Sequence, residues 1–235
     1  MSSYLAGRLL GGERGAAQLT AILGADTGND SQWFPALRTL RLLRKLTDVE
    51  LRLDTGATNI AKSRSRHFTA AVDSKCSGWL TIDDDVEASL ETLGWLLAAI
   101  EGNEPRICMA PCLLRDGQTA NVEWTELYSV RRVDHHLFPH GQARRARRGG
   151  FGLVAMNRAA LDRIASHNPR TWLDDDGERK WWVFAETQVP RGDSLRWLGE
   201  DLSFFENVPV GVEIEALSTG ETMHAGYGLD FGELT

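Results

Sequence analysis

Hydrophobic and polar positions alternate with two different periods along the first hundred residues. Short apolar or alternating runs at 19–24, 49–53 and 79–82 have the length and the residue types of β-strands. Longer segments between these runs repeat apolar residues every three to four positions, which is typical of helices. Strands and helices that alternate in this way favour an α/β fold with a mainly parallel sheet.

Three helices are predicted in this first half. One begins near Ser31, buries an apolar stripe and exposes a basic face to solvent. The apolar stripe consists of Trp33, Leu37, Leu40 and Leu43. The basic face consists of Arg38, Arg41 and Lys45. A second spans 60–72, with Ile60, Phe68 and Val72 turned inward. The third spans 90–100 and is strongly amphipathic.

The pattern changes after about residue 105. Strands are expected at 107–110, 121–130, 152–156 and 210–216, and helices at 157–166 and from Glu200 onward. A long polar and basic loop is expected between 130 and 150, and a Trp-rich stretch precedes Glu200. The second half therefore predicts antiparallel additions, so that the whole is a mixed, mainly parallel sheet flanked by helices.

Composition narrows the class of protein without naming a function. The chain has 235 residues, 42% of them hydrophobic and 25% charged, which is ordinary for a folded soluble protein. Its net charge of −7 gives no overall signature of polyanion binding. We expect no membrane span and no secretory signal, because no apolar run is long enough. Three cysteines do not form a disulfide framework, so a reducing cytoplasm is the expected compartment.

An acidic cluster follows one of the predicted buried strands. The strand at 79–82 runs directly into Asp83, Asp84 and Asp85. Side chains alternate along a strand, so Asp83 and Asp85 lie on the same side. Two carboxylates at a strand end suit a hard divalent cation. The alternative is a solvated acidic turn at the start of the next helix, where carboxylates favour the helix dipole.

Two further features carry candidate chemistry. Glu200 and Asp201 open a short predicted helix, where acidic residues also serve simply to complement the dipole. His224 follows the last predicted strand, and a lone histidine of this kind is also consistent with a packed or surface residue. Each feature taken alone is unspecific, but their order along the chain is informative.

That order resembles the GT-A-fold glycosyltransferases that use nucleotide sugars, in particular family 2-like members. The resemblance rests on the Asp-x-Asp at Asp83–Asp85, the glycine-rich turn at 149–152, Glu200-Asp201 and the C-terminal His224. Arg64 corresponds to an arginine that precedes the Asp-x-Asp strand in this family. Ser65 stands where the family usually has Asn, which is a departure in detail. The match runs from about residue 19 to residue 226.

The resemblance implies one GT-A domain over 1–235, with a donor-binding half at 18–104 and an acceptor and catalytic half at 105–232. It implies a nucleotide-diphosphate sugar donor, a UDP-sugar being favoured, and an acceptor hydroxyl attacked with inversion. It also implies Mn²⁺ or Mg²⁺ held by Asp83, Asp85 and His224. Oxygen ligands with one imidazole suit Mn²⁺ somewhat better.

Roles for further residues follow from the same resemblance. Asp201 is expected to act as general base, and Glu200 to orient the acceptor or the loop. Arg64 is expected to reach the nucleotide or phosphates of the donor. The donor site would also include Asp83 and Gly150 of the glycine turn. Asp26 and Asp54 follow the first two strands, where they either bind the base of the donor or form turns; both readings stay open.

The basic segment before the glycine turn has two interpretations. It contains Arg144, Arg145, Arg147 and Arg148. One interpretation is a solvated loop that closes over the donor diphosphate. The other is a site for a polyanionic acceptor, such as a modified base in DNA. For the whole chain, the alternatives to a glycosyltransferase are a nucleotidyltransferase of similar fold and a noncatalytic module that binds sugar or nucleic acid.

Overall fold

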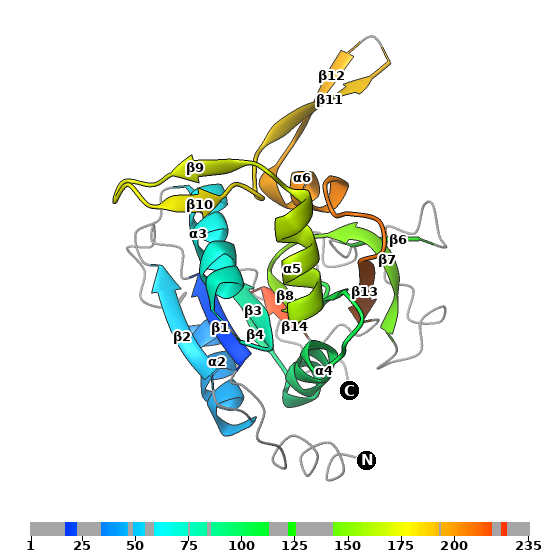
Figure 1. The fold of residues 1–235 in the computed structure, drawn as a ribbon. Helices are drawn as coiled ribbons and strands as arrows, with labels where there is room; N and C mark the ends of the chain where they lie inside the picture. Colours follow the sequence, from blue (N-terminus) through cyan, green and yellow to red (C-terminus); the bar gives the residue numbers. More distant parts are fainter. Residues whose placement is uncertain are drawn as a thin grey trace.

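Eight strands form one sheet at the centre of the molecule (Figure 1). The computed structural model describes residues 17–22, 34–46, 49–54, 59–74, 76–83, 86–112, 122–125, 143–192, 194–217 and 222–224. The strand order is β2-β1-β3-β8-β5-β13-β7-β6. The strands are β1 (Ala17–Ile22), β2 (Val49–Asp54), β3 (Gly78–Asp83), β5 (Arg106–Met109), β6 (Val122–Trp124), β7 (Ala143–Gly149), β8 (Leu153–Asn157) and β13 (Glu213–Leu217).

The sheet is mixed, but most of its strands share one direction. β1 is parallel to both β2 and β3, and β13 is parallel to β5. β8 is antiparallel to both β3 and β5, and β7 is antiparallel to both β13 and β6. Only β7 and β8 of these eight described strands are therefore reversed. The α/β fold class with a mixed, mainly parallel sheet is confirmed.

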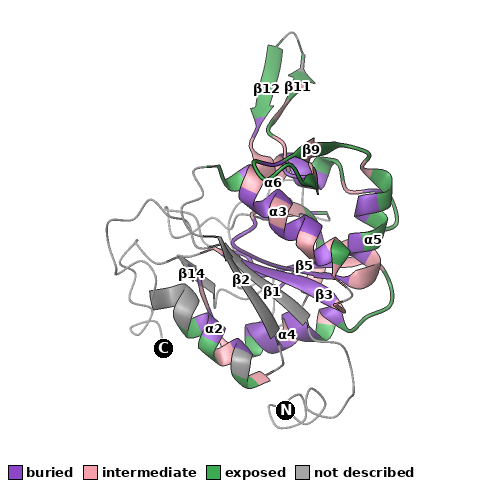
Figure 2. Ribbon diagram, turned by 60° about the vertical axis from the view of Figure 1, so that its left-hand side comes forward, coloured by how far each residue is buried: buried purple, intermediate pink, exposed green. Residues whose placement is uncertain are grey.

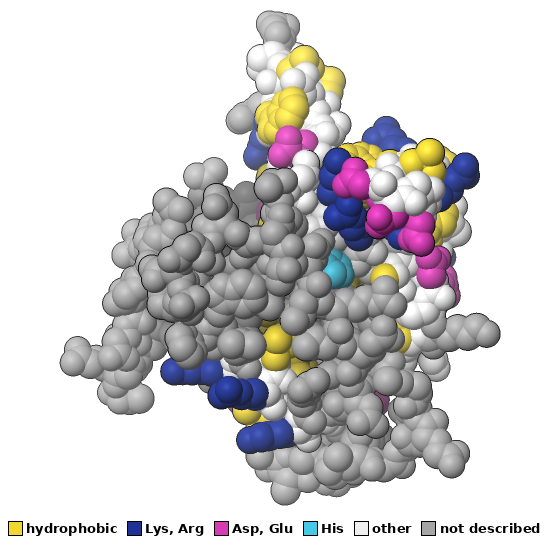
Figure 3. Space-filling model, turned by 90° about the vertical axis from the view of Figure 1, so that its left-hand side faces the viewer, with side chains coloured by type: hydrophobic (Ala, Val, Ile, Leu, Met, Phe, Trp, Pro, Cys, Tyr) yellow, Lys and Arg dark blue, Asp and Glu magenta, His cyan; other side chains and the backbone are white. Residues whose placement is uncertain are grey.

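Helices cover both faces of this sheet (Figures 1 and 2). α3 (Ile60–Asp73) and α5 (Arg158–His167) lie on one face, and α2 (Phe34–Leu46) and α4 (Leu90–Ile100) lie on the other. Side-chain caps explain where three of them begin, because Asn59, Ser89 and Asn157 each accept a backbone N–H three residues ahead. The basic face of α2 (Arg38, Arg41 and Lys45) is exposed as expected, and basic side chains are visible on that side in Figure 3.

Strand β8 shows how the sheet divides the interior into two cores. Val154 and Met156 join the apolar cluster under α3 and α5, whereas Leu153 and Ala155 join the cluster under α4. Successive side chains of a strand point to opposite faces, so one central strand supplies both cores. All five residues of β8 are buried, as expected for a strand covered by helices on both sides.

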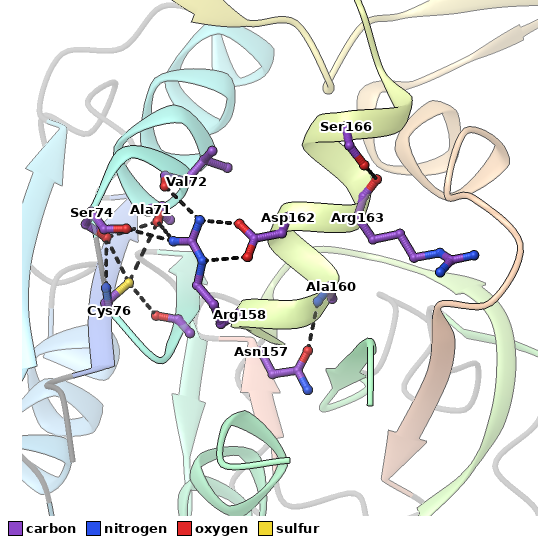
Figure 4. A network of polar contacts seen from close by, with 11 residues as sticks. Ala71, Val72, Ser74, Cys76, Asn157, Arg158, Ala160, Asp162, Arg163 and Ser166 are labelled. Carbon is purple, nitrogen blue, oxygen red and sulfur yellow. Dashed lines mark hydrogen bonds and ion pairs between the residues drawn. The ribbon is translucent and has the colours of Figure 1, made fainter. Parts of the chain in front are cut away.

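An arginine at the start of α5 ties that helix to α3 (Figure 4). Arg158 donates to the backbone oxygens of Ala71, Val72 and Ser74, with distances of 2.7–3.0 Å, at the C-terminal end of α3. The same guanidinium pairs with Asp162 one turn further along α5. The free carbonyls at a helix C-terminus attract cations, so this contact fixes the end of α3.

Three small antiparallel pairs surround the sheet. They are β9 (Thr171–Leu173) with β10 (Arg179–Trp181), β11 (Thr187–Arg191) with β12 (Ser194–Leu198), and β4 (Val86–Ala88) with β14 (Thr222–His224). The β11–β12 hairpin projects from the body (Figure 1), and Leu195 and Trp197 remain exposed on it. These pairs were not predicted, since their strands are only three to five residues long.

Three details of the predicted elements are wrong. The strand expected at 210–216 begins only at Glu213, because residues 210–211 form a turn. Residues 143–149 were expected in a loop, but they form strand β7, because β13 and β6 offer hydrogen-bonding partners on its two sides. Ile60 was expected to face inward but is 41% exposed at the first turn of α3. Within the described residues, no helix has the length and apolarity needed to cross a membrane.

Candidate functional site

Asp83 is placed by the end of a buried strand. Residues 78–82 of β3 are buried, and Asp83 is the first residue of the strand to reach the surface, with a side chain that is 20% exposed. The backbone N–H of Asp83 donates to the oxygen of Gly152 at 2.9 Å, which holds the strand end against the glycine-rich turn. Asp84 and Asp85 lie outside the described residues.

Glu200 and Asp201 occupy the first turn of α6 (Glu200–Glu206), as predicted. Gly199 precedes the helix and provides no side-chain cap. The two carboxylates are 19% and 26% exposed, and both point toward α3. They are therefore not only solvated charges that complement a helix dipole, because each has a buried partner.

That partner is Arg64, whose side chain is only 2% exposed. Its Nη2 lies 3.1 Å from both carboxylate oxygens of Asp83. Its Nη1 donates to Glu200 Oε1 at 3.1 Å and to Asp201 Oδ1. One guanidinium thus brings together carboxylates that are separated by more than a hundred residues in the sequence.

The glycine-rich turn supplies the other contact to Asp201. The backbone N–H of Phe151 donates to Asp201 Oδ2 at 3.1 Å, and Gly150 directly precedes it. The ring of Phe151 is fully buried, and its centroid lies 5.4 Å from the guanidinium carbon of Arg64. Both oxygens of Asp201 are therefore held, one by α3 and one by the turn before β8.

Burial and neighbouring charge set the protonation of this cluster. Desolvation raises the pKa of Asp201 to about 6; Glu200 and Asp83 raise it as well, while Arg64 and the Phe151 N–H oppose the shift. Desolvation would lower the pKa of Arg64, but the three carboxylates together raise it. The cluster thus sets three carboxyl groups against one guanidinium.

The backbone of His224 lies close to the residues that follow the aspartates. Strand β14 pairs with β4 so that His224 is opposite Val86, the residue directly after Asp85. Directly opposed residues of an antiparallel pair have Cα atoms about 4.5–5.5 Å apart. Residues 222–224 therefore return to the end of β3, although the His224 side chain lies outside the described residues. Within those residues, no group of three His, Cys, Asp or Glu is arranged to hold a metal ion.

Two more predicted donor residues are placed only in part. Asp54 ends β2, and the register of β2, β1 and β3 aligns Asp54 with Ile22 and Ile22 with Asp83. Two strand spacings then separate the backbones of Asp54 and Asp83, roughly 10 Å. The side chain of Asp54 and all of Asp26 lie outside the described residues.

The predicted arginine loop is a strand, and three of its arginines have acidic partners. Arg145 pairs with Glu213 of β13. Arg147 and Arg148 each pair with Glu123 of β6 and Glu206 of α6. Arg144 is half-buried. These contacts join β7 to its neighbours, and they do not bring the arginines to the Arg64 cluster.

A groove of about 790 Å³ lies elsewhere, between the C-terminal ends of α5 and α6. Arg163, His167, Trp182 and Val210 are among its lining residues, and none of the predicted site residues lines it. Its arginines, Arg163 and Arg170, lie near the C-terminus of α5, where positive charge complements the dipole. We therefore place the candidate site at the Arg64 cluster, where buried charge converges.

Sequence reasoning missed the central place of Arg64 and the role of the Phe151 N–H. A signal for Arg64 was present, because Ala61, Arg64, Phe68 and Ala71 recur at helical spacing and all four are buried. An arginine on such a stripe must find buried partners. No side-chain pattern signals the Phe151 N–H, since a backbone donor depends on the shape of the turn.

Comparison with known proteins gives a likeness of fold. No protein-family model and no curated protein matches this chain. The crystal structure of A197 from STIV aligns with a TM-score of 0.50 at 12% identity, covering 85% of this chain and 81% of that chain. A structure of GalNAc-T7 with UDP, GalNAc and Mn2+ aligns with a TM-score of 0.48 at 12% identity. This alignment covers 90% of this chain and 43% of that chain, so this chain spans less than half of the length of GalNAc-T7 in that structure.

Proposed function

We propose that this chain is a glycosyltransferase of the GT-A type, which moves a sugar from a nucleotide-diphosphate donor to an acceptor hydroxyl with inversion. One observation carries the proposal: Arg64 gathers Asp83, Glu200 and Asp201 at the end of β3, beside the glycine-rich turn. These residues belong to the sequence motifs that resemble the family, and they lie far apart in the chain. In open α/β sheets, ligands bind beyond the carboxyl ends of the strands.

In this proposal Asp201 takes the proton of the acceptor hydroxyl. The hydroxyl oxygen forms a bond to the anomeric carbon while the bond from that carbon to the diphosphate breaks, and the electron pair stays on the bridging oxygen. Arg64 and the Phe151 N–H each hold one oxygen of Asp201, so the carboxylate keeps one orientation. A pKa of about 6 leaves Asp201 ionised at neutral pH and still a better base than an ordinary carboxylate.

The charge of the cluster fits a divalent cation. Three carboxylates face one guanidinium, and the remaining negative charge is what a cation of charge two would balance. We assign its ligation to Asp83 and Asp85, with His224 as the third ligand. When bound, such a cation stabilises negative charge on the departing diphosphate.

The test is metal-dependent turnover of a nucleotide sugar by the full chain. We expect slow release of UDP from one of UDP-glucose, UDP-GlcNAc or UDP-GalNAc in the presence of Mn²⁺, and calorimetric binding of UDP that needs the metal. Asp83→Asn should weaken that binding at least tenfold. Asp175→Asn is the matched control, because that carboxylate is 82% exposed and pairs with Arg66, away from the cluster. Undiminished turnover in excess EDTA would exclude the metal assignment.

The acceptor needs a separate test. A nucleic-acid acceptor was one of two interpretations of the arginines now found in β7. Arg145, Arg147 and Arg148 each have acidic partners, which counts against this interpretation. A mobility shift of labelled DNA at low salt that disappears as salt rises would support it. If no shift occurs at low salt, a saccharide, lipid-linked or protein acceptor is favoured.

A further inference from the structure

Arg64 sits beneath the carboxylates and is shielded from any ligand above them. Its side chain is 2% exposed, and both terminal nitrogens are engaged by carboxylate oxygens. The ring of Phe151 covers it at 5.4 Å. A donor phosphate would have to displace at least one carboxylate to reach the guanidinium. The direct contact to the donor that the sequence predicted is therefore unfavourable in this arrangement.

We infer that Arg64 is a positioning residue, which sets the distance between the donor-side carboxylate Asp83 and the base Asp201. This inference rests on the proposed function of the cluster. Arg64 contacts both of these carboxylates, one through each terminal nitrogen. Because the guanidinium is planar and rigid, the separation of its two nitrogens is fixed, and with it the spacing of the groups that they bind.

The elements that carry these residues make such a link necessary. Asp83 ends a strand of the first half, Asp201 begins a helix of the second half, and Arg64 comes from α3 between them in space. Gly199 gives α6 no side-chain cap, so the first turn of α6 depends on contacts of its own carboxylates. Removal of the link would leave Asp201, among the described residues, with its contact to the Phe151 N–H.

Arg64 also affects the charge of the base. The groups that face Asp201 are Arg64 of α3, Asp83 of β3, Glu200 of α6 and the N–H of Phe151. Arg64 is the cation among them and opposes the upward shift of the Asp201 pKa. Loss of its charge should therefore raise that pKa further, whereas a lysine would retain the charge without contacting both carboxylates.

The experiment compares the full-length variants Arg64→Lys and Arg64→Met with the wild type and with Arg66→Lys. Arg66 is the matched control, because it lies on the same helix and pairs with the exposed Asp175. The readouts are kcat, the KM for the UDP-sugar that the wild type turns over, and the pH profile with Mn²⁺ present. We expect Arg64→Met to lose at least about 100-fold in kcat, with a donor KM within about threefold of the wild type. The acid limb of the pH profile of this variant should move to higher pH by at least half a unit.

The conservative variant separates charge from geometry. Arg64→Lys should keep the acid limb within a few tenths of a unit of the wild type but still lose at least about tenfold in kcat. Arg66→Lys should match the wild type. A raised donor KM with unchanged kcat in Arg64→Lys would overturn the inference and show direct donor binding. Because Arg64→Lys keeps the charge, it decides the question even if Arg64→Met does not fold.

A measurement without turnover distinguishes failure of the inference from failure of the proposed function. Crystal structures of the folded variants report the separation of the Asp83 and Asp201 carboxylates directly. If no UDP-sugar is turned over by the wild type, the proposed function fails. The positioning role is then judged by whether that separation changes in Arg64→Met and Arg64→Lys relative to the wild type and Arg66→Lys. An unchanged separation in a folded Arg64→Met protein would overturn the inference by itself.

Discussion

Two groups of charged residues were both candidate binding sites in the sequence, and they differ in the structure. At the Arg64 cluster, one buried guanidinium faces three carboxylates, so negative charge is in excess. On β7, Arg145, Arg147 and Arg148 face Glu123, Glu206 and Glu213, so the charges there are closely matched. The cluster is mostly desolvated, whereas Arg145 and Arg147 are 71% and 56% exposed. Unbalanced buried charge marks a candidate site, and balanced exposed charge marks a structural contact.

The largest expected effect comes from removal of the base. Asp201→Asn should lower kcat by about 10²–10⁴-fold, because the acceptor hydroxyl loses its proton acceptor. The donor KM should change little, and steady-state release of UDP with a sugar acceptor measures both quantities. Asp175→Asn makes the same chemical change on an exposed carboxylate and should leave kcat unchanged. If Asp201→Asn kept full transfer activity, Asp201 would not be the base, and the Arg64 cluster would lose its main functional difference from β7.

A smaller effect should appear in the pH dependence of activity. The pKa of Asp201 is raised to about 6, so the ionised base is lost as the pH falls through that value. We expect log kcat/KM to rise by about one per pH unit below pH 6 and to level off above it. If activity instead fell off near pH 4, as for an exposed carboxylate, the pKa of Asp201 would not be raised by burial.

The same shift predicts a change in stability of known sign. The folded state holds this proton more tightly than the unfolded state, in which the pKa is about 3.9. Between about pH 4 and pH 6 the contribution of Asp201 to stability therefore falls as the pH rises. Thermal unfolding should show Asp201→Asn gaining stability relative to the wild type from pH 4 to pH 7. A relative loss over this range would show that the ionised form is favoured by the fold.

The smallest effects are expected on β7, and only on stability. Arg148 is 15% exposed and donates to Glu123 at 2.6 Å and to Glu206 at 2.7 Å. Arg148→Met should lower the free energy of unfolding by about 1 kcal/mol. Arg145→Met, at a 71% exposed side chain, should cost less than about 0.5 kcal/mol. Urea unfolding measures both, and a loss of turnover without a loss of stability would assign β7 to the site.

Much of the fold was predictable because its strands and helices follow simple periods. The helices at 60–73, 90–100 and 158–167 and the strands β2, β3 and β8 were expected within a few residues. β7 was not, since Ala143–Gly149 has arginines on both faces and no apolar alternation. Its acidic partners lie from 24 to 68 residues away in sequence, so only the folded sheet brings them together.

The candidate site was predictable as a set of residues but not as an arrangement. Asp83, Glu200, Asp201 and Arg64 were selected by type and order along the chain. Their common contact through Arg64 depends on how α3 crosses the end of β3, which local sequence does not specify. The proposed roles of the four residues stay predictions until activity is measured.

The place of β8 in the sheet has a consequence for any attempt to divide this chain. β8 comes from the second half, yet it is inserted between β3 and β5 of the region before it. A cut between the donor and acceptor halves would separate β8 from β3, leaving one unpaired strand edge on each fragment, and it would remove the Arg158 contact that holds the end of α3. Both fragments should therefore be prone to aggregation, and expression as separate modules should fail even though each half carries part of the site.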